Sequence, residues 1–280
     1  MNGQSHNIGP EDYAEHSCVL CGEPYGAEPK VRPIPQQRII GKMDEYMSRR
    51  DYAGAERHLR YWLAEAQLGG DKRGELLIRN ELVGHYRKTG EREKALSNGD
   101  AALALLDELD FGGTISSGTT YTNVATACSA FGENERALSL FEKARTVYES
   151  SPRTAPELLG GLYNNMALAC ASLGQYDRAF ELYGKAMDAM GKVPGGVLEQ
   201  AITCLNMAGA VEARDGMEAG EHRIFDLVDR AWDLLNDPSA PQNGYCAFVY
   251  EKCAPTFSYY GYFAAAEELN ERAKQLYERT

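Results

Sequence analysis

Two cysteines near the start of the chain, Cys18 and Cys21, have the spacing of metal ligands. They lie in the segment HSCVLCGEPYG, where two intervening residues allow both sulfurs to reach one metal ion. Gly22 follows directly, and a glycine at this place can take a positive φ that turns backbone N–H groups toward the sulfurs. A redox dithiol is the other chemistry open to the pair, but the motif neither follows a predicted strand nor begins a predicted helix that would stabilise a thiolate. The pair thus indicates a zinc knuckle, working or degenerate, with a redox dithiol as the alternative.

One Cys-x-x-Cys pair is only half of a structural zinc site, which needs four ligands. The sequence has no second Cys-x-x-Cys and no pair of histidines at zinc-ligand spacing. Cys246 and Cys253 cannot both complete the site from one helix, because seven residues rise about 10.5 Å and each sulfur must lie about 2.3 Å from the metal. One of these cysteines, His6, His16 or a second copy of the chain could supply the rest. Zinc is therefore a possible cofactor, and no other cofactor is indicated.

Catalytic constellations are not found in the sequence. It has no Gly-x-Ser-x-Gly, His-Glu-x-x-His, Gly-x-x-x-x-Gly-Lys-Ser/Thr or Gly-x-Gly-x-x-Gly motif. Acidic pairs such as Glu267 and Glu268 lie on predicted amphipathic helices and indicate solvated faces rather than an acid/base couple. The histidines lack partners at catalytic spacing; they are His6, His16, His58, His85 and His222. We therefore do not expect an enzyme.

The elements that would position any site are repeated. Three stretches centred on Gly90, Gly132 and Gly174 follow one another at steps of 42 residues. Alanines stand five and twelve residues after each glycine: Ala95, Ala102, Ala137, Ala144, Ala179 and Ala186. An apolar run, a glycine, a short polar turn and a second apolar run predict two helices joined by a tight turn. A repeat of this period indicates a solenoid, in which neighbouring units stack to form a continuous core.

This pattern resembles the tetratricopeptide repeat in its longer form, as in kinesin light chains and bacterial repeat regulators. The residues that carry the resemblance are Tyr121, Val124, Ala125, Cys128, Ala137, Phe141 and Ala144, and one repeat later Tyr163, Met166, Ala167, Cys170, Ala179, Tyr183 and Ala186. The resemblance extends from about Pro35 to the end. It implies an all-α fold, a right-handed α-solenoid of about six helix pairs over residues 36–280. Residues 1–35 are expected to form an irregular, proline-rich tail that holds the cysteine knuckle.

Several positions depart from the repeat but keep its phase. Arg50 stands where the first repeat should have its glycine, and Pro255 falls inside the penultimate predicted helix. We expect Pro255 to kink or break that helix, because proline removes one backbone hydrogen bond. Four cysteines fall at core positions and are expected to act as small apolar side chains: Cys128, Cys170, Cys204 and Cys253.

Composition limits the classes of partner and the location. The net charge is −12 and the pI is about 5.0, which argues against nucleic acid, because phosphate binding needs clustered Lys and Arg. No run of 18 apolar residues is present, and the first residues lack the features of a signal peptide. We therefore expect a cytoplasmic protein that binds neither nucleic acid nor membranes.

An asparagine column is the most informative feature of the repeats. Asn123, Asn165 and Asn206 occupy one repeat position at steps of 42 and 41 residues. An asparagine amide can bond both the C=O and the N–H of an extended peptide, and the resemblance implies that such residues on the concave face hold peptides. The flanking inner positions are Thr122, Thr126, Asn164, Leu168, Leu205 and Gly209. They lack the lysines and arginines of the chaperone-tail clamp, so a neutral groove for an extended or helical apolar segment is expected.

Three functions remain open on the sequence alone. The first is a non-enzymatic module that holds a protein or peptide through Asn123, Asn165, Asn206, Thr122, Thr126 and Asn164. The second is a ligand-responsive regulator that senses a signalling peptide, although residues 1–35 are too short and proline-rich for the effector domain that such regulators usually carry. The third is a zinc-binding or redox-sensing adaptor that uses Cys18 and Cys21.

Overall fold

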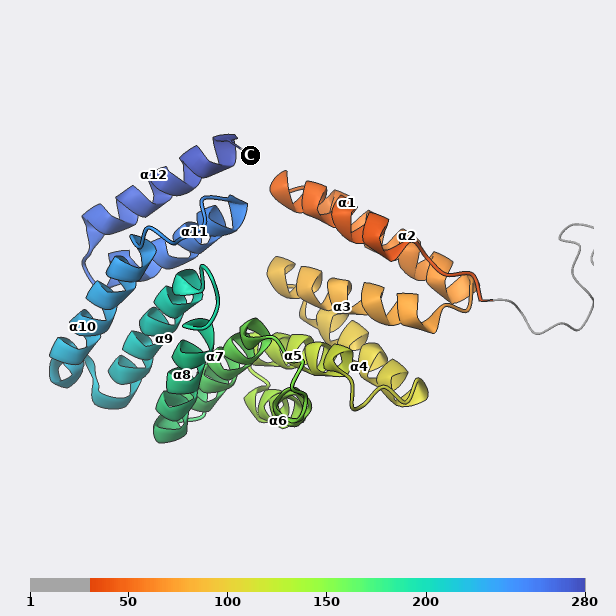
Figure 1. The fold of residues 1–280 in the computed structure, drawn as a ribbon, viewed down its shortest axis with the longest axis horizontal. Helices are drawn as coiled ribbons and strands as arrows, with labels where there is room; N and C mark the ends of the chain where they lie inside the picture. The colour runs from red at the N-terminus through yellow and green to blue at the C-terminus, as the bar shows by residue number, and fades with distance from the viewer. Residues whose placement is uncertain (1–30, 280) are drawn as a thin grey trace, which may run out of the picture.

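The computed structural model describes residues 31–279, and its regular structure is helical. In this part of the chain twelve α-helices form six consecutive pairs (Figure 1). The first helices of the pairs are α1 (Gln36–Ser48), α3 (Lys72–Thr89), α5 (Ile115–Ala130), α7 (Pro156–Ser172), α9 (Val197–Asp215) and α11 (Gly244–Tyr259). The second helices are α2 (Tyr52–Leu68), α4 (Arg92–Glu108), α6 (Asn134–Ser150), α8 (Tyr176–Met190), α10 (Met217–Leu235) and α12 (Phe263–Arg279). None of these twelve has the length and apolar character that crossing a membrane requires.

A residue with positive φ lies between the two helices of every pair. Five of these residues are glycines, which adopt this conformation without a Cβ clash: Gly90, Gly132, Gly174, Gly216 and Gly261. Arg50 takes the same place in the first pair with a φ of 55°, a conformation that costs an L-residue about 1–2 kcal/mol. The phase assigned to the degraded first repeat is therefore correct, and the turn is kept there despite its cost.

Small side chains allow the helices to pack closely. Ala137 and Ala144 of α6 are fully buried, as are Ala125 of α5 and Ala167 of α7. The large side chains Phe141 and Tyr183 fill the space between these close contacts, and both are also fully buried. This alternation of small and large residues lets neighbouring pairs interlock. The stripes predicted for the two helix pairs α5–α6 and α7–α8 are confirmed.

Pro255 was expected to kink or break its helix, and the break is wrong. Helix α11 continues through it from Gly244 to Tyr259. Pro255 is exposed, whereas Cys253, Ala254 and Phe257 beside it are buried. Packing of this buried face against neighbouring helices outweighs the single backbone hydrogen bond that proline removes.

The segment before α1 is fastened to the first repeats. The N–H of Arg32 donates to the carbonyl oxygen of Gly69 at 2.9 Å, and the N–H of Ile34 donates to Asp71 Oδ2 at 2.9 Å. The side chain of Ile34 is buried. Residues 32–34 therefore lie against the turn between α2 and α3, and the first pair is anchored from outside its own helices.

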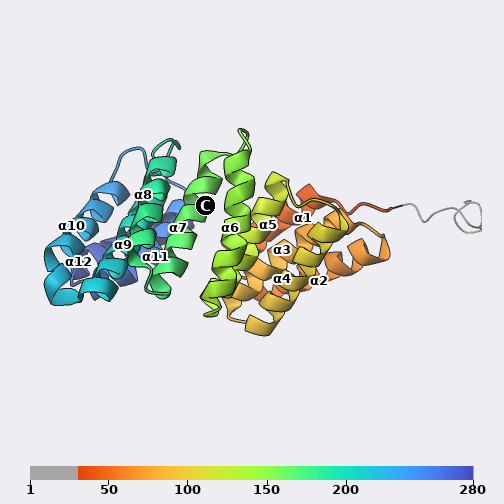
Figure 2. The same ribbon diagram turned by 90° about the horizontal axis from the view of Figure 1, so that it is seen from below.

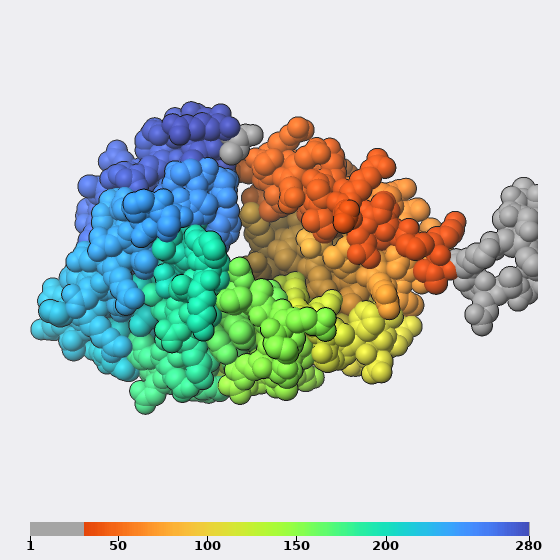
Figure 3. Space-filling model, in the orientation of Figure 1, coloured from red at the N-terminus to blue at the C-terminus, as the bar shows by residue number. Residues whose placement is uncertain are grey.

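The array curls until its two ends approach each other (Figure 1). Figure 2 shows the same array from below. Arg50 Nη2, in the turn after α1, lies 2.6 Å from Glu251 Oε1 of α11. Its guanidinium also lies over the ring of Tyr277 in α12, 5.4 Å from the ring centroid, and Tyr277 Oη donates to Glu251 Oε2 at 3.1 Å. The helices thus surround a central hollow, which Figure 3 shows between the N-terminal and C-terminal pairs.

Candidate functional site

The first helices of five pairs, all except α9, line a cavity of about 560 Å³ on the inner face of the array. Most of its wall comes from α1 and α3. Helix α5 contributes Thr122, Asn123 and Thr126, helix α7 contributes Asn165, and helix α11 contributes Phe248 from the opposite end of the array. Ligand cavities usually measure about 300–1,000 Å³, so the space is large enough for a short peptide segment.

Asparagine amides reach from one first helix to the next along this cavity. Asn123 Nδ2 donates to Asn80 Oδ1 at 3.5 Å, and Asn165 Nδ2 donates to Thr126 Oγ1 at 3.3 Å. Among the described residues nothing donates to Asn123 Oδ1. Each amide is therefore oriented by its neighbour but keeps part of its hydrogen-bonding capacity, as an asparagine that binds a peptide backbone must.

The six predicted peptide contacts do not all share this cavity. Thr122, Thr126, Asn123 and Asn165 line it, but Asn164 faces a separate cavity of about 140 Å³ between α7, α9 and α11. Asn206 Nδ2 donates to Asn164 Oδ1 at 3.0 Å, and Asn206 lines neither cavity. The asparagine column is thus divided: Asn123 and Asn165 face the large cavity, whereas Asn206 holds the side chain of Asn164.

The sequence-based prediction missed residues of α1 and α3. Asn80, Glu81, His85 and Arg87 of α3 line the large cavity, and so does Asp44 of α1. Met43 and Met47 of α1 add apolar surface to the same wall. The repeat itself contained the signal, because one step of 42 residues back from Thr122 and Asn123 gives Asn80 and Glu81.

Unpaired charges face this cavity. Within residues 31–279, neither Glu81 nor Arg87 forms a side-chain hydrogen bond or an ion pair. Burial, followed by the nearby Asp44 carboxylate, raises the pKa of Glu81. Arg87 is exposed overall, yet neighbouring atoms displace part of its water and lower the pKa of its guanidinium. Both charges lack the counter-charge that would offset this loss of hydration.

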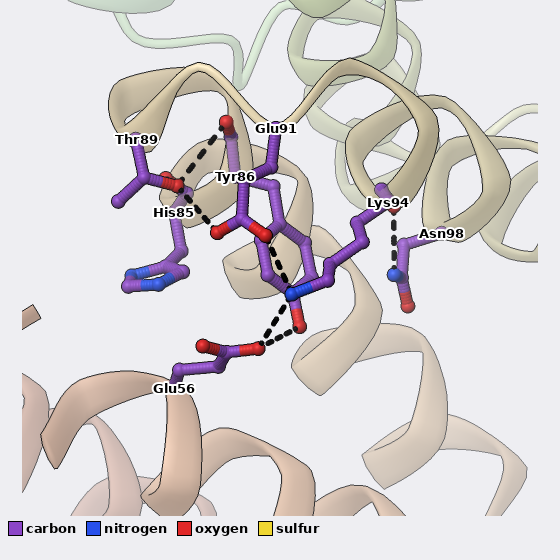
Figure 4. Close-up of polar contacts among 7 residues, drawn as sticks. All are labelled: Glu56, His85, Tyr86, Thr89, Glu91, Lys94 and Asn98. Atoms are coloured by element: carbon purple, nitrogen blue, oxygen red, sulfur yellow. Dashed lines mark hydrogen bonds and ion pairs between the residues drawn. The ribbon is translucent and has the colours of Figure 1, made fainter. Parts of the chain in front are cut away.

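His85 is a buried polar group of the same wall. The residue is 6% exposed, and its Nδ1 atom is buried without a hydrogen-bond partner. Figure 4 shows its imidazole beside a polar network but not bonded to the groups drawn there. Burial lowers the pKa of His85, so the ring is neutral at pH 7. It can exchange a hydrogen bond with a ligand without bringing a further charge.

A polar network fixes α3 against the helices on either side of it (Figure 4). Glu56 Oε1 of α2 accepts from Tyr86 Oη at 2.9 Å and from Lys94 Nζ of α4 at 3.1 Å. Lys94 also lies 2.5 Å from Glu91 Oε2, which belongs to the turn after α3. Because Tyr86 directly follows His85, this network holds the cavity-facing part of α3 in place.

The described cysteines pack in the core. Cys128, Cys170, Cys204 and Cys253 are buried, as their repeat positions predicted. Burial raises the pKa of each thiol, to about 12 for Cys253, so these side chains are unreactive thiols at neutral pH. Within residues 31–279 no group of three or more His, Cys, Asp or Glu side chains could hold a metal ion. Cys18 and Cys21 lie outside the described residues, and their zinc site stays a prediction.

Two segments of the chain match family models of the tetratricopeptide repeat. They are residues 74–150, which cover α3 to α6 apart from the start of α3, and residues 160–193, which cover most of α7 and all of α8. The chain is therefore a tetratricopeptide repeat protein, as the residue pattern predicted. Repeats of this family bind proteins or peptides, so the fold is that of a protein–protein interaction module. No curated protein matches the chain.

Solved structures of similar shape share little sequence with it. A putative kinesin light chain of Podosopora anserina with nearly identical repeats is 18% identical, with a TM-score of 0.48, over 71% of this chain and 92% of that one. BtubC (BKLC) from P. vanneervenii is 17% identical, with a TM-score of 0.47, over 87% and 91%. A Rap protein complexed with competence and sporulation factor is 14% identical, with a TM-score of 0.48, over 88% and 77%.

Proposed function

We propose that the chain is a non-catalytic module that holds an extended segment of a protein or peptide in the cavity between α1, α3, α5 and α7. The observation that carries this proposal is the line of amides from Asn80 through Asn123 to Asn165, next to the apolar surface of Met43 and Met47. Amides bond a peptide backbone whatever its sequence, whereas the apolar wall accepts side chains. The net charge of −12 does not favour nucleic acid as the ligand.

Selection from a displayed library of random peptides on the intact purified chain tests this function. Peptides that bind should lose about thirtyfold in affinity to Asn123→Ala/Asn165→Ala, because two hydrogen bonds of about 1 kcal/mol each are lost. Asn270→Ala is the matched control, since Asn270 is exposed on α12, away from the cavity. Failure to select any peptide, or equal binding by the double variant, would contradict the proposal.

A ligand-responsive regulator is the second candidate, and the closure of the array favours it. Phe248 of α11 lines the same cavity as residues of α1 and α3, so a ligand there would touch both ends of the chain at once. Binding would then shift the balance between closed and open arrays, which is the physical basis of a ligand response. Small-angle scattering with and without a selected peptide tests this candidate; an unchanged profile at saturation would exclude it.

A further inference from the structure

Glu81 and Arg87 present opposite charges to one cavity without pairing with each other. They lie six residues apart on α3, whereas ion pairs along a helix join residues three or four apart. Their positions differ by about 9 Å along the helix axis. The helix therefore keeps the two charges separate, and neither neutralises the other.

Neighbouring charged residues do not supply these counter-charges. Asp44 adds a second carboxylate near Glu81 and increases the local negative charge. Lys88 lies over the rings of Tyr52 and Phe248, at 5.3 and 5.5 Å from their centroids. Residues 1–30, which lie outside the described part of the chain, contain five acidic residues and one lysine, Lys30. Among the described residues no basic side chain pairs with Glu81, so its carboxylate is open to a basic group of a bound ligand.

On this basis we infer that the cavity recognises a dipolar peptide segment, with a basic side chain at Glu81 and Asp44 and a carboxylate at Arg87. This inference rests on the proposed peptide-binding function and names the chemistry of its ligand. Extended chain advances about 3.3 Å per residue, so the separation along α3 corresponds to a basic and an acidic residue about three positions apart. His85, whose Nδ1 atom is buried without a hydrogen-bond partner, lies on α3 between the two charges and lines the same cavity.

The same geometry explains why a dipolar ligand is favoured over a singly charged one. A ligand that brought only a basic group would leave Arg87 without a counter-charge, and a purely acidic ligand would leave Glu81 and Asp44 unpaired. Closing the cavity around a peptide removes further water from Glu81, Asp44 and Arg87, which makes each unpaired charge more costly. A segment with both charges offsets both costs at once.

The test uses the peptide library selection on the intact chain, with Glu81→Gln and Arg87→Gln as variants. Peptides selected on the unmodified chain should carry a Lys or Arg about three positions from an Asp, a Glu or a terminal carboxylate. Glu81→Gln should remove the preference for the basic residue alone, and Arg87→Gln the preference for the acidic group alone. Each variant should weaken a selected dipolar peptide about tenfold or more, because a charge-assisted hydrogen bond is lost.

Matched controls are Glu267→Gln and Arg57→Gln, which remove exposed charges from α12 and α2 away from the cavity. Both should select the same peptides as the unmodified chain, and circular dichroism should show that every variant keeps its helical content. Peptides that bind without the charge pattern, or with a pattern that Glu81→Gln does not alter, would overturn this inference and leave the peptide-binding function standing. If no peptide binds at all, both fail.

Discussion

Arg50 and Glu251 join the first and last repeats, with Nη2 and Oε1 2.6 Å apart although 201 residues separate them in the sequence. Five repeats have a glycine where the first has Arg50, and all six residues take a positive φ. Replacing glycine by arginine at this turn costs backbone strain. What the arginine adds is its guanidinium, which contacts Glu251 and Tyr277.

The first prediction is that this contact keeps the array closed. Both partners are exposed, with 59% and 39% of their side chains accessible, and such pairs contribute about 0–1 kcal/mol. Glu251→Gln should therefore enlarge the radius of gyration in small-angle scattering and hardly change the free energy of unfolding. High salt should have a similar effect on the unmodified chain, because it screens exposed charges. Glu278→Gln, on exposed α12 surface, is the control; identical scattering by all three proteins would contradict the prediction.

A second prediction concerns the close helix contacts at Ala125 and Ala167. Both side chains are fully buried, so Ala125→Leu or Ala167→Leu must displace packed neighbours. Each substitution should lower the free energy of unfolding by about 1–3 kcal/mol, measured by urea denaturation. Ala264→Leu adds the same volume at an exposed site of α12 and should change it much less. Equal effects at all three sites would show that the repeat phase is wrong.

The third prediction follows from the raised pKa of Glu81, which burial and Asp44 produce. Below its ordinary pKa of 4.5, the Glu81 carboxyl is protonated in both the folded and the unfolded chain. As pH rises through the raised pKa, the folded state loses stability relative to the unfolded state. Glu81→Gln should therefore increase the free energy of unfolding at pH 7, and the increase should vanish at about pH 4. Urea denaturation at both pH values checks this prediction, and a variant that is less stable than the unmodified chain at pH 7 would contradict it.

Zinc at the N-terminal cysteine pair is the fourth prediction. If Cys18 and Cys21 form a working knuckle, zinc should co-purify with the chain and be released by Cys18→Ser, because thiolates are its ligands. Elemental analysis measures the metal, and thiol alkylation at neutral pH reports whether the sulfurs are free. Metal-free protein with both thiols alkylated would end the zinc hypothesis.

The sequence predicted those features that depend on local spacing. The alanines of α6 and α8, the buried cysteines and the turn at Arg50 follow from the repeat, whose turn residues are 42 residues apart in the middle of the chain and 40 and 45 apart at its two ends. The possible break at Pro255 was wrong because the cost of one missing hydrogen bond is local, whereas the packing of Cys253 and Phe257 that outweighs it comes from other helices.

The candidate site was only partly predictable. Asn123 and Asn165 were found from their spacing, and Glu81 could have been found by one more step of the same repeat. Phe248 could not have been found in this way, because its place in the cavity depends on the curvature that accumulates over the whole array. The contact of Arg50 with Glu251 depends on the same sum of small rotations between pairs, which a residue pattern does not encode explicitly.

The fifth prediction separates two asparagines that the sequence pattern treats as equivalent. Asn165 lines the large cavity, whereas Asn206 lies outside it and donates to Asn164 Oδ1 at 3.0 Å. For a peptide selected on the intact chain, Asn165→Ala should weaken binding about fivefold, the effect of one lost hydrogen bond. Asn206→Ala should leave the affinity unchanged, because its amide contacts α7 rather than the ligand. Fluorescence anisotropy with a labelled peptide measures both variants. Equal losses would mean that the ligand follows the whole asparagine column past α7, and the binding site would then extend along the entire inner face.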